Sequence, residues 1–514
     1  MGTGASDGGI GPEQGPGPLR RWDAPKATDL APGPPGLAAN QGGGIGVRGV
    51  RRDRAPSEAC LTPAPTSLKF HRFRMAPLHP RIGPSPTMTI PVSLSASARR
   101  TQPPSISHLM QTALENPEIV SLAAGFVDQQ TLPVELVGEI VAGLAAEPVE
   151  ARRSLQYGTT IGDHALRERL VARLEREDGR PAGSCKEVIP RTVVTTGSAQ
   201  LIYLVGEALV DQGDIVLVES PTYFVFLGPM ETRGARVIGI PVDEGGLRLD
   251  ALEATLAGIE AEGQLDRVKL IYTIPEHSNP SGISLAADRR GPLVELARRW
   301  SRSHRIFILE DAAYRGLSFG ATEPPSVWSH DREGDTVILA RTFSKTFSPG
   351  IKLGYGIVPE ALIDPILYTK GNHDFGSAHF NQRLVERALA SGGYDRHVAR
   401  LNELYQRKSK VFLAALDDSL GGLDSGISWT RPEGGLFVWM TLPEGVDTGL
   451  DGPLFPRSVR EGVLYVPGEF AFAPEPAPRP KNHIRLTFGV PREDELVEGT
   501  RRLGAALRFV LGNL

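Results

Sequence analysis

The sequence predicts an α/β fold with a mostly parallel sheet, followed by a smaller α+β domain. Between residues 191 and 341, apolar runs of strand length alternate with amphipathic segments. This alternation is typical of parallel sheets whose strands are joined by crossover helices. Beyond residue 358 it gives way to long helices and then short strands, which indicates a second domain of mixed architecture.

The expected strands of the main sheet are rich in Val, Ile and Leu, a composition that suits strands buried on both faces. In chain order they are "RTVVTT", "DIVLVES", "ARVIGIPV", "VKLIYTIP", "RIFILED" and "TVILAR". The amphipathic segments predict helices over 198–210, 248–260 and 285–302. In the second domain we expect helices over about 378–391 and 394–418, strands in "GISWTRPEGGLFVWMTLP", "GVLYVPG" and "NHIRLTFGV", and a last helix from about residue 492.

The composition of the 514-residue chain is that of an ordinary globular protein, with 40% hydrophobic residues and a formal net charge of -4. This balance argues against a general nucleic-acid binder, because phosphate contacts need a concentrated basic surface. Two cysteines, Cys60 and Cys185, cannot build a disulfide framework or a Cys-rich metal site, and they fit a reducing, cytoplasmic compartment. The apolar run "LIYLVGEALV" is interrupted by Glu207, so no transmembrane helix is expected.

The first 90 residues are rich in Gly, Pro, Ala and Arg and show no periodic apolar pattern. Such a segment cannot bury enough apolar surface to offset its ordering entropy, so disorder is expected. An alternative interpretation is that translation begins at Met75 or Met88. The predicted organisation is a disordered extension over 1–100, an N-terminal segment packing on the small domain over 101–150, a large domain over 151–370 and a small C-terminal domain over 371–514.

A phosphate-binding motif follows the first expected strand. In α/β sheets, ligands bind beyond the carboxyl ends of the strands. "TTGSAQ" lies at such an end and begins a helix: Gly197 permits a tight turn, and Ser198 and Gln200 flank free backbone N–H groups. A helix N-terminus of this kind suits a phosphate. The same residues would also serve as a plain helix cap.

Three further strands end in "SPTY", "SNPSG" and "EDAAY", which place Tyr223, Asn279 and Asp311 at the same edge. Each has a structural alternative: Tyr223 could fill the core, Asn279 could be a turn residue, and Asp311 could cap a helix. Asp311 could equally hold a protonated ring nitrogen in a buried site. The next loop, "RTFSKTFSPGIK", contains Lys345, which alone would be a surface charge. Together these groups are what pyridoxal phosphate requires: a phosphate cradle, a stacking ring, an acid and a lysine.

The ordered set of motifs resembles the fold-type-I pyridoxal-phosphate aminotransferases of class I/II. The nearest branches are the 2-aminoadipate/kynurenine aminotransferases and the aminotransferase domain of MocR regulators. The resemblance covers about residues 104–512 and rests on "SLAAGFVD", "LQYGTTIGDHALRERL", "TTGSAQ", "SPTY", "SNPSG", "EDAAY", "SKTFSPGIKLGYG", "RPEGGLFVWMTLP", "VPGEFAFAP" and "IRLTFG". It implies a seven-stranded, mostly parallel sheet in the large domain, a homodimer, and transfer of an amino group between an α-amino acid and a 2-oxo acid.

The resemblance also implies roles for single residues. Lys345 would hold the cofactor as a Schiff base and then shuttle the Cα proton of the substrate. Asp311 would pair with the ring nitrogen, and Tyr223 would stack on the ring. Arg485, with Gly125 and Asn279, would bind the substrate, because guanidinium geometry suits a bidentate clamp on a carboxylate. The implied cofactor-binding residues are Gly197, Ser198, Ala199, Gln200, Tyr223, Asn279, Asp311, Tyr314, Thr342, Ser344, Lys345 and Lys352, with Tyr157 reaching in from the second subunit. No metal is expected.

The chain departs from the family pattern near the expected site. Lys352 stands where the branch usually has arginine, and His277 with Ser278 replaces an aromatic–Gln pair. Asp128, followed by two glutamines, is expected at the substrate entrance and favours a polar or cationic substrate.

These departures leave an alternative open: a pyridoxal-phosphate enzyme that uses a quinonoid intermediate for β- or γ-replacement, cyclisation or oxidation. A non-enzymatic sensor is a third hypothesis. It is disfavoured because the catalytic set is complete and no helix-turn-helix domain precedes the core.

Overall fold

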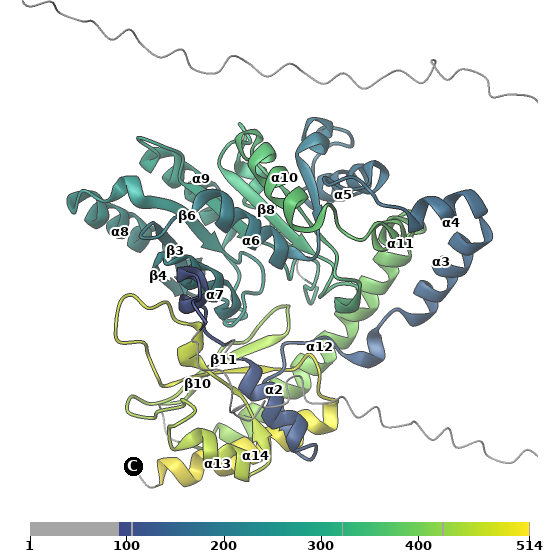
Figure 1. Ribbon diagram of the computed structural model, residues 1–514. Helices are drawn as coiled ribbons and strands as arrows, with labels where there is room; N and C mark the ends of the chain where they lie inside the picture. Colours follow the sequence, from purple (N-terminus) through teal and green to yellow (C-terminus); the bar gives the residue numbers. More distant parts are fainter. Residues whose placement is uncertain (1–91, 104–105, 321, 424–425, 513–514) are drawn as a thin grey trace, which may run out of the picture. The chain divides into compact units, whose positions relative to one another are not determined.

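The computed structural model describes residues 92–103, 106–320, 322–423 and 426–512 (Figure 1). They lie in one compact unit, Thr89–Leu514. The predicted extension up to residue 91, with Cys60, Met75 and Met88, lies outside the described residues.

The larger sheet consists of β2 Thr192–Thr195, β3 Ile215–Ser220, β4 Arg236–Asp243, β5 Gly246–Leu247, β6 Val268–Thr273, β7 Phe307–Asp311, β8 Val337–Thr342 and β9 Gly354–Ile357. Their order is β2-β9-β8-β7-β6-β3-β4-β5. The neighbours from β4 to β8 pair in parallel, whereas β9 is antiparallel to both β2 and β8. The prediction of a mostly parallel sheet is therefore confirmed. The eighth strand, β5, forms a two-residue hairpin with β4, because Gly246 at φ +83° lets the chain turn back.

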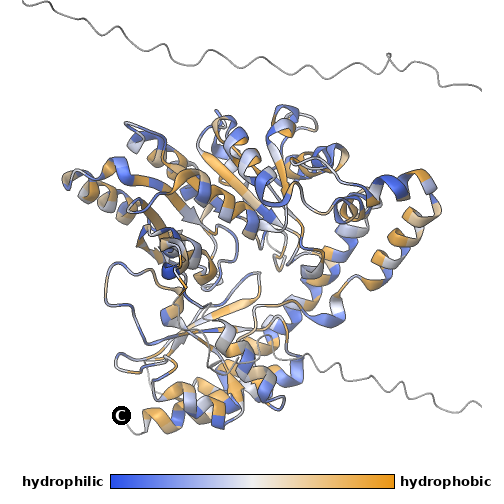
Figure 2. Ribbon diagram, viewed as in Figure 1, coloured by the Kyte–Doolittle hydropathy of each residue, from blue (hydrophilic) through white to orange (hydrophobic). Residues whose placement is uncertain are grey.

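Helices cover both faces of this sheet, as its apolar strands predict. They are α6 Ser198–Leu209, α7 Phe224–Arg233, α8 Leu249–Ala261, α9 Ala287–Trp300 and α10 Glu360–Asp374. Along β3, Val216 and Val218 belong to the core that contains α6, α7 and α10, whereas Ile215 and Leu217 belong to the core that contains α8 and α9. This alternation follows the two-residue period of a strand. Figure 2 shows hydrophobic residues along the strands and on part of each covering helix.

A second, four-stranded sheet follows in the C-terminal part of the chain. It consists of β10 Ser428–Trp429, β11 Phe437–Thr441, β13 Val466–Pro467 and β14 His483–Thr487. The order is β10-β11-β14-β13, and all pairs are antiparallel. Separately, β1 Val120–Ser121 pairs in parallel with β12 Val463–Leu464, which joins the N-terminal segment to this part. The domain limits at residues 150 and 370 stay a prediction.

The remaining helices include several that the sequence reading did not identify. They are α1 Ala96–Arg100, α2 Ile106–Glu115, α3 Val134–Ala146, α4 Pro148–Leu155, α5 His164–Glu177, α11 His379–Ala390, α12 Gly393–Leu420, α13 Leu454–Arg460 and α14 Glu493–Leu511. The helices that were predicted end within about two residues of the observed limits, which is the usual uncertainty of helix ends. Among the described residues, no helix combines the length and the apolar character needed to cross a membrane.

The last residues assigned to the predicted extension, 96–100, form helix α1. The hydroxyl of Ser95 accepts a hydrogen bond from the N–H of Ala98 and caps this helix. Arg100 donates to the carbonyl oxygens of Thr232 (2.9 Å) and Arg233 (3.2 Å). These contacts attach α1 to the end of α7. They are tertiary, so local composition does not reveal them.

Candidate active site

The residues predicted at the strand ends come together at the carboxyl edge of the parallel sheet. Asp311 is the last residue of β7, and Lys345 lies in the loop after β8. Tyr223 and Asn279 follow β3 and β6. Because the carboxyl ends of neighbouring parallel strands meet at one edge, these four side chains converge. Electrostatic interactions of Asp311 with both Lys345 and Tyr223 show their proximity.

Asp311 is a buried carboxylate with one oxygen occupied and one oxygen free. Its Oδ2 accepts a hydrogen bond of 2.8 Å from the hydroxyl of Tyr272, while Oδ1 has no hydrogen-bond partner among the described residues. Burial raises the pKa of Asp311 to about 6, although the hydrogen bond from Tyr272 and the backbone N–H of Ala313 act in the opposite direction. Asp311 is therefore ionised at neutral pH, and its free oxygen Oδ1 can accept a hydrogen bond from an N–H or O–H group of a ligand.

Lys345 lies opposite the N-terminal segment that follows β1. Its Nζ donates a hydrogen bond of 2.6 Å to the carbonyl oxygen of Gly125. Burial, together with the positive charges of Arg485 and Lys352, lowers the pKa of Lys345 to about 8, while the carboxylate of Asp311 acts in the opposite direction. A neutral amine is the nucleophilic form of lysine, so this environment favours reaction with a carbonyl carbon.

Arg485, on β14, brings a buried guanidinium to the same place. It donates to Oδ1 of Asn279 (3.0 Å) and to the carbonyl oxygen of Ala123 (2.7 Å), and its side chain is 2% exposed. Burial lowers the pKa of Arg485 to about 10. Its hydrogen-bond partners in the described residues include no carboxylate, and its Nε has no partner there. An unpaired buried cation is costly unless it receives an anion, so Arg485 is suited to a ligand carboxylate.

Aromatic side chains surround these charged groups. Tyr314 accepts a hydrogen bond of 3.4 Å from Nδ2 of Asn279, and its ring lies edge-on to Phe437 at 5.7 Å. Phe437 in turn lies 4.5 Å beneath the guanidinium of Arg485. Burial raises the pKa of Tyr223 to about 12, so its hydroxyl stays protonated. These rings supply the apolar walls of the site.

The predicted phosphate cradle lies at the N-terminus of α6. Gly197 adopts φ +74° and precedes the first turn of the helix at Ser198, whose N–H groups have no intrahelical acceptor. The backbone of β9 packs directly against this turn: a Cβ added to Gly354 would lie 2.7 Å from the N atom of Ser198. Thr342 and Ser344 place hydroxyls 3.0 Å apart after β8. Hydroxyls beside a helix N-terminus form an anion-binding site.

The side chain of Gln200 does not point into this cradle. Its Oε1 accepts from the N–H of Thr196 (2.8 Å), and its Nε2 donates to Asp374 (2.7 Å). Lys370, which is fully buried, donates to Asp374 (2.8 Å) and contacts Gln200 (3.4 Å). Gln200 thus fixes the start of α6 to α10. Any contact it makes with a phosphate comes from its backbone. The sequence analysis did not identify the ion pair of Lys370 with Asp374. The only sequence feature that indicates this pair is the i, i+4 spacing of the two residues on a helix.

Among the residues that depart from the family pattern, Asp128 does not lie where it was expected. Asp128 is buried and forms a 2.6 Å ion pair with Lys408, so it does not line a polar entrance. Gln129 and Gln130 are exposed. Nε2 of His277 lies 2.9 Å from the hydroxyl of Ser318, and its side chain packs against Gly434 and Gly435. The structure therefore removes Asp128 and His277 as arguments for a polar substrate.

Lys352 and Tyr157 lie at the surface of the chain. Lys352 is exposed in a left-handed backbone conformation at φ 51°. Tyr157 is 81% exposed, and its ring packs edge-on against exposed Phe375 at 5.5 Å. Among the described residues of a single chain, Tyr157 contacts Phe375 and Gln156 and forms no hydrogen bond with the predicted cofactor residues.

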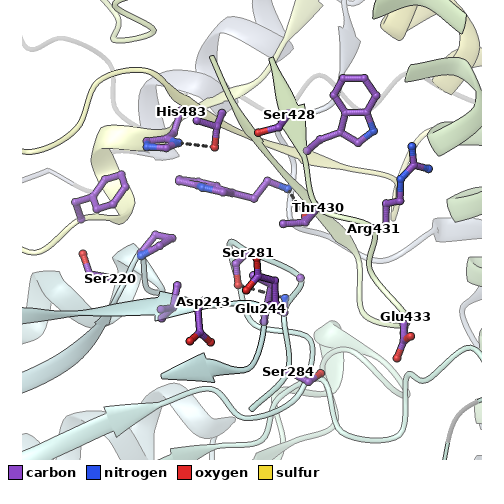
Figure 3. A pocket seen from close by; sticks show the side chains of 18 residues that line it. Ser220, Asp243, Glu244, Ser281, Ser284, Ser428, Thr430, Arg431, Glu433 and His483 are labelled. Carbon is purple, nitrogen blue, oxygen red and sulfur yellow. Dashed lines mark hydrogen bonds between the residues drawn. The ribbon is translucent and has the colours of Figure 1, made fainter. Parts of the chain in front are cut away.

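A separate pocket of about 800 Å³ lies beside the site (Figure 3). His483 stacks on Trp439 at 5.3 Å and hydrogen-bonds Thr441 there. Ser281 and Ser220 line it from the loops that carry Asn279 and Tyr223. Lys345 and Asp311 are not among its lining residues, so the pocket adjoins the candidate site without containing its reactive groups.

The groups gathered at this edge of the sheet fit pyridoxal phosphate bound with an amino acid. The free Oδ1 of Asp311 fits a protonated ring nitrogen, and the start of α6 fits the phosphate. The amine of Lys345 fits the aldehyde carbon, and unpaired Arg485 fits the substrate carboxylate. The fold and these groups together define a pyridoxal-phosphate-dependent transferase of fold type I.

Comparison with known proteins agrees with this class. Residues 117–498 match the model of the family described as aminotransferase class I and II. The chain is 32% identical to aromatic-amino-acid aminotransferase 1 of Thermococcus litoralis, over 82% of this chain and 96% of that protein. It is also 32% identical to the 2-aminoadipate transaminase of Thermus thermophilus, over 80% and 96% of the two chains. The structure of the kynurenine aminotransferase of Pyrococcus horikoshii, solved in complex with PMP, superposes with a TM-score of 0.73 at 31% sequence identity. The match covers 81% of this chain and 97% of that one.

The chain therefore belongs to the class I and II aminotransferase family. Pyridoxal phosphate is its cofactor, and it transfers amino groups between amino acids and 2-oxo acids. The resemblance predicted from the sequence, including its kynurenine and 2-aminoadipate branches, is confirmed.

Proposed function

We propose that this aminotransferase reacts through Lys345 and uses Arg485 to hold the α-carboxylate of its substrates. The observation that carries the proposal is the buried guanidinium of Arg485, which has no carboxylate partner in the described part of the chain. It lies close enough to Lys345 to lower the pKa of that amine. A substrate carboxylate on Arg485 would neutralise this charge and place the adjoining Cα near Nζ.

Each remaining group has a distinct task in this proposal. When bound, pyridoxal phosphate supplies an electron-accepting ring next to the substrate amino group. Asp311 holds the proton on the ring nitrogen, and the start of α6 with Ser344 holds the phosphate. Lys345, whose pKa is about 8, takes the proton from Cα as a neutral amine. Tyr223, Tyr314 and Phe437 exclude water from the ring.

We further propose that the amino donor has a long side chain, either aromatic or of the 2-aminoadipate type. The relatives named for aromatic amino acids and for 2-aminoadipate support this class, each at 32% identity. The burial of Asp128 against Lys408 removes this carboxylate from the polar entrance that favoured a bulky polar or cationic substrate. The donor class thus rests on the comparisons and on a corrected view of the site entrance.

A panel of donors would test both proposals. The purified full-length protein, with 2-oxoglutarate as acceptor, should transfer the amino group of phenylalanine, tyrosine, kynurenine or 2-aminoadipate faster than that of alanine. Phenylethylamine is the matched control, because it has the phenylalanine side chain without the carboxylate. Its kcat/KM should be lower by roughly 10- to 100-fold, the loss of one charge-assisted contact. Equal rates for phenylalanine and phenylethylamine would refute the clamp. Preference for alanine would refute the donor class.

We also propose a homodimer in which Tyr157 serves the phosphate of the partner's site. The exposed, mutually packed rings of Tyr157 and Phe375 support this assembly, and Leu155 beside them is 76% exposed. Contiguous exposed apolar groups of this kind usually mark an interaction surface. A cytoplasmic location, supported by the low cysteine content, and a role in amino-acid biosynthesis complete the proposal.

The dimer predicts a specific effect of removing one hydroxyl. Tyr157→Phe should leave the dimer intact but weaken cofactor binding by about 10-fold, because one hydrogen bond to a charged phosphate is lost. Light scattering should give twice the 55.3 kDa chain mass, and cofactor titration should give the affinity. Tyr368→Phe, at another exposed tyrosine, is the control and should change neither quantity. A fully active monomer would contradict the shared site.

A further inference from the structure

Tyr272 is a buried residue that sequence reasoning did not identify as part of the site. It lies on β6, where its side chain shares the core of α6 and α7, and it is 0% exposed. Its ring stacks on Phe226 of α7 with centroids 3.7 Å apart and planes 4° apart. From this fixed position, its hydroxyl donates the 2.8 Å hydrogen bond to Oδ2 of Asp311.

The hydrogen bond distinguishes the two oxygens of Asp311. A carboxylate can rotate about its last side-chain torsion, but a donor fixed on one oxygen opposes this rotation. Oδ2 is held by Tyr272, and Oδ1 stays without a partner among the described residues. The stack on Phe226 prevents the tyrosine ring from following a displaced carboxylate.

We propose that Tyr272 is a positioning residue that holds Oδ2 of Asp311, so that Oδ1 faces the ring nitrogen of the cofactor and accepts its N–H. The inference rests on the role proposed for Asp311. Without the hydroxyl, Oδ2 would be a buried anionic oxygen with one donor fewer. The carboxylate would then be less stable and would compete with the ring nitrogen for the proton.

The test compares two cofactors on two proteins. Apoprotein of the wild type and of Tyr272→Phe is titrated with pyridoxal phosphate and with an analogue that has carbon in place of the ring nitrogen. The wild type should prefer pyridoxal phosphate, and Tyr272→Phe should reduce the ratio of the two affinities by about 10-fold, the value of one hydrogen bond to a charged group. Since removing the hydroxyl raises the pKa of Asp311, the acid limb of kcat/KM should move to higher pH.

The outcomes separate this proposal from the role of Asp311 itself. A wild type that does not distinguish the two cofactors would refute the pairing of Asp311 with the ring nitrogen. If the wild type binds pyridoxal phosphate more tightly than the analogue and Tyr272→Phe shows the same ratio of affinities, only the role of Tyr272 is refuted. If the variant binds both cofactors more weakly by the same factor, the role of Tyr272 is also refuted, because that result indicates only a structural contribution of the hydroxyl.

Two further variants control for loss of a buried hydroxyl and for misfolding. Tyr465→Phe removes a comparable buried hydrogen bond, from the Tyr465 hydroxyl to the carbonyl oxygen of Thr448 at 2.9 Å, and should leave the affinity ratio unchanged. If Tyr272→Phe does not fold, Phe226→Leu keeps the hydroxyl but removes the stack. That variant should lower the ratio by a smaller factor, and an unchanged ratio would overturn the proposal.

Discussion

Replacing Lys345 with alanine is expected to lower kcat by at least about 10⁴-fold, the upper range for loss of a positioned acid–base group. The amine of Lys345 is buried, its pKa is lowered to about 8, and its Nζ lies 2.6 Å from the carbonyl oxygen of Gly125. In the described structure it is the lysine placed with both Asp311 and Arg485. Its loss removes both the covalent attachment of the cofactor and the group that moves the Cα proton.

Peptide mapping after borohydride reduction would check this assignment independently of turnover. The wild type should carry the reduced cofactor on the peptide that contains Lys345, and Lys345→Ala should carry none. Lys269→Ala is the control, because Nζ of Lys269 donates only to the carbonyl oxygen of Asp266 at 2.9 Å, away from the site. Label on another lysine in the wild type would show that the assignment is wrong.

Replacing Asp311 with asparagine should lower kcat by roughly 10²- to 10⁴-fold while part of the cofactor stays bound. Asparagine has nearly the same shape but cannot hold a proton on the ring nitrogen by charge. The pKa of Asp311 is raised to about 6 by burial, so in the wild type the carboxylate is present above that pH and is lost as the pH falls through it. Activity of the wild type should therefore decline below about pH 6.

The pH profile distinguishes this electrostatic role from a structural one. In Asp311→Asn the residual activity should lack the acid limb assigned to Asp311, because amide groups do not titrate in this range. Glu310→Gln is a useful comparison: the neighbouring carboxylate faces the N–H groups of Val327 (3.0 Å) and Trp328 (2.7 Å) instead of the site. That variant should lose stability but keep the acid limb. Near-normal turnover in Asp311→Asn would leave Asp311 as a structural residue.

The fold could be predicted because its main signals are local. Continuous Val-, Ile- and Leu-rich runs identify strands buried on both faces, and the observed cores on the two sides of β3 have this arrangement. The two-residue strands β1 and β5 were missed because they depend on pairing and not on composition. The placement of α1 on the end of α7 likewise depends on contacts across more than 100 positions of the chain.

The site could be predicted only where a motif marks it. Lys345 and Asp311 lie in recognisable loops, so the sequence located them. Tyr272 was taken as part of an apolar strand, because its hydroxyl partner lies 39 residues away and leaves no local trace. Asp128 was misplaced for a related reason: its partner, Lys408, is 280 residues distant. Burial and pairing of single polar side chains are tertiary properties that one sequence does not display.

The pairing of β1 with β12 has a consequence for the order in which this protein matures. Val120 pairs with Val463, and Gly125, a few residues later, accepts the hydrogen bond from Lys345. The guanidinium that contacts Ala123 belongs to Arg485. A nascent chain leaving the ribosome therefore exposes one wall of its reaction centre long before the opposite wall has been translated. The site can reach its final geometry only after Arg485 has been synthesised and β1 has paired with β12.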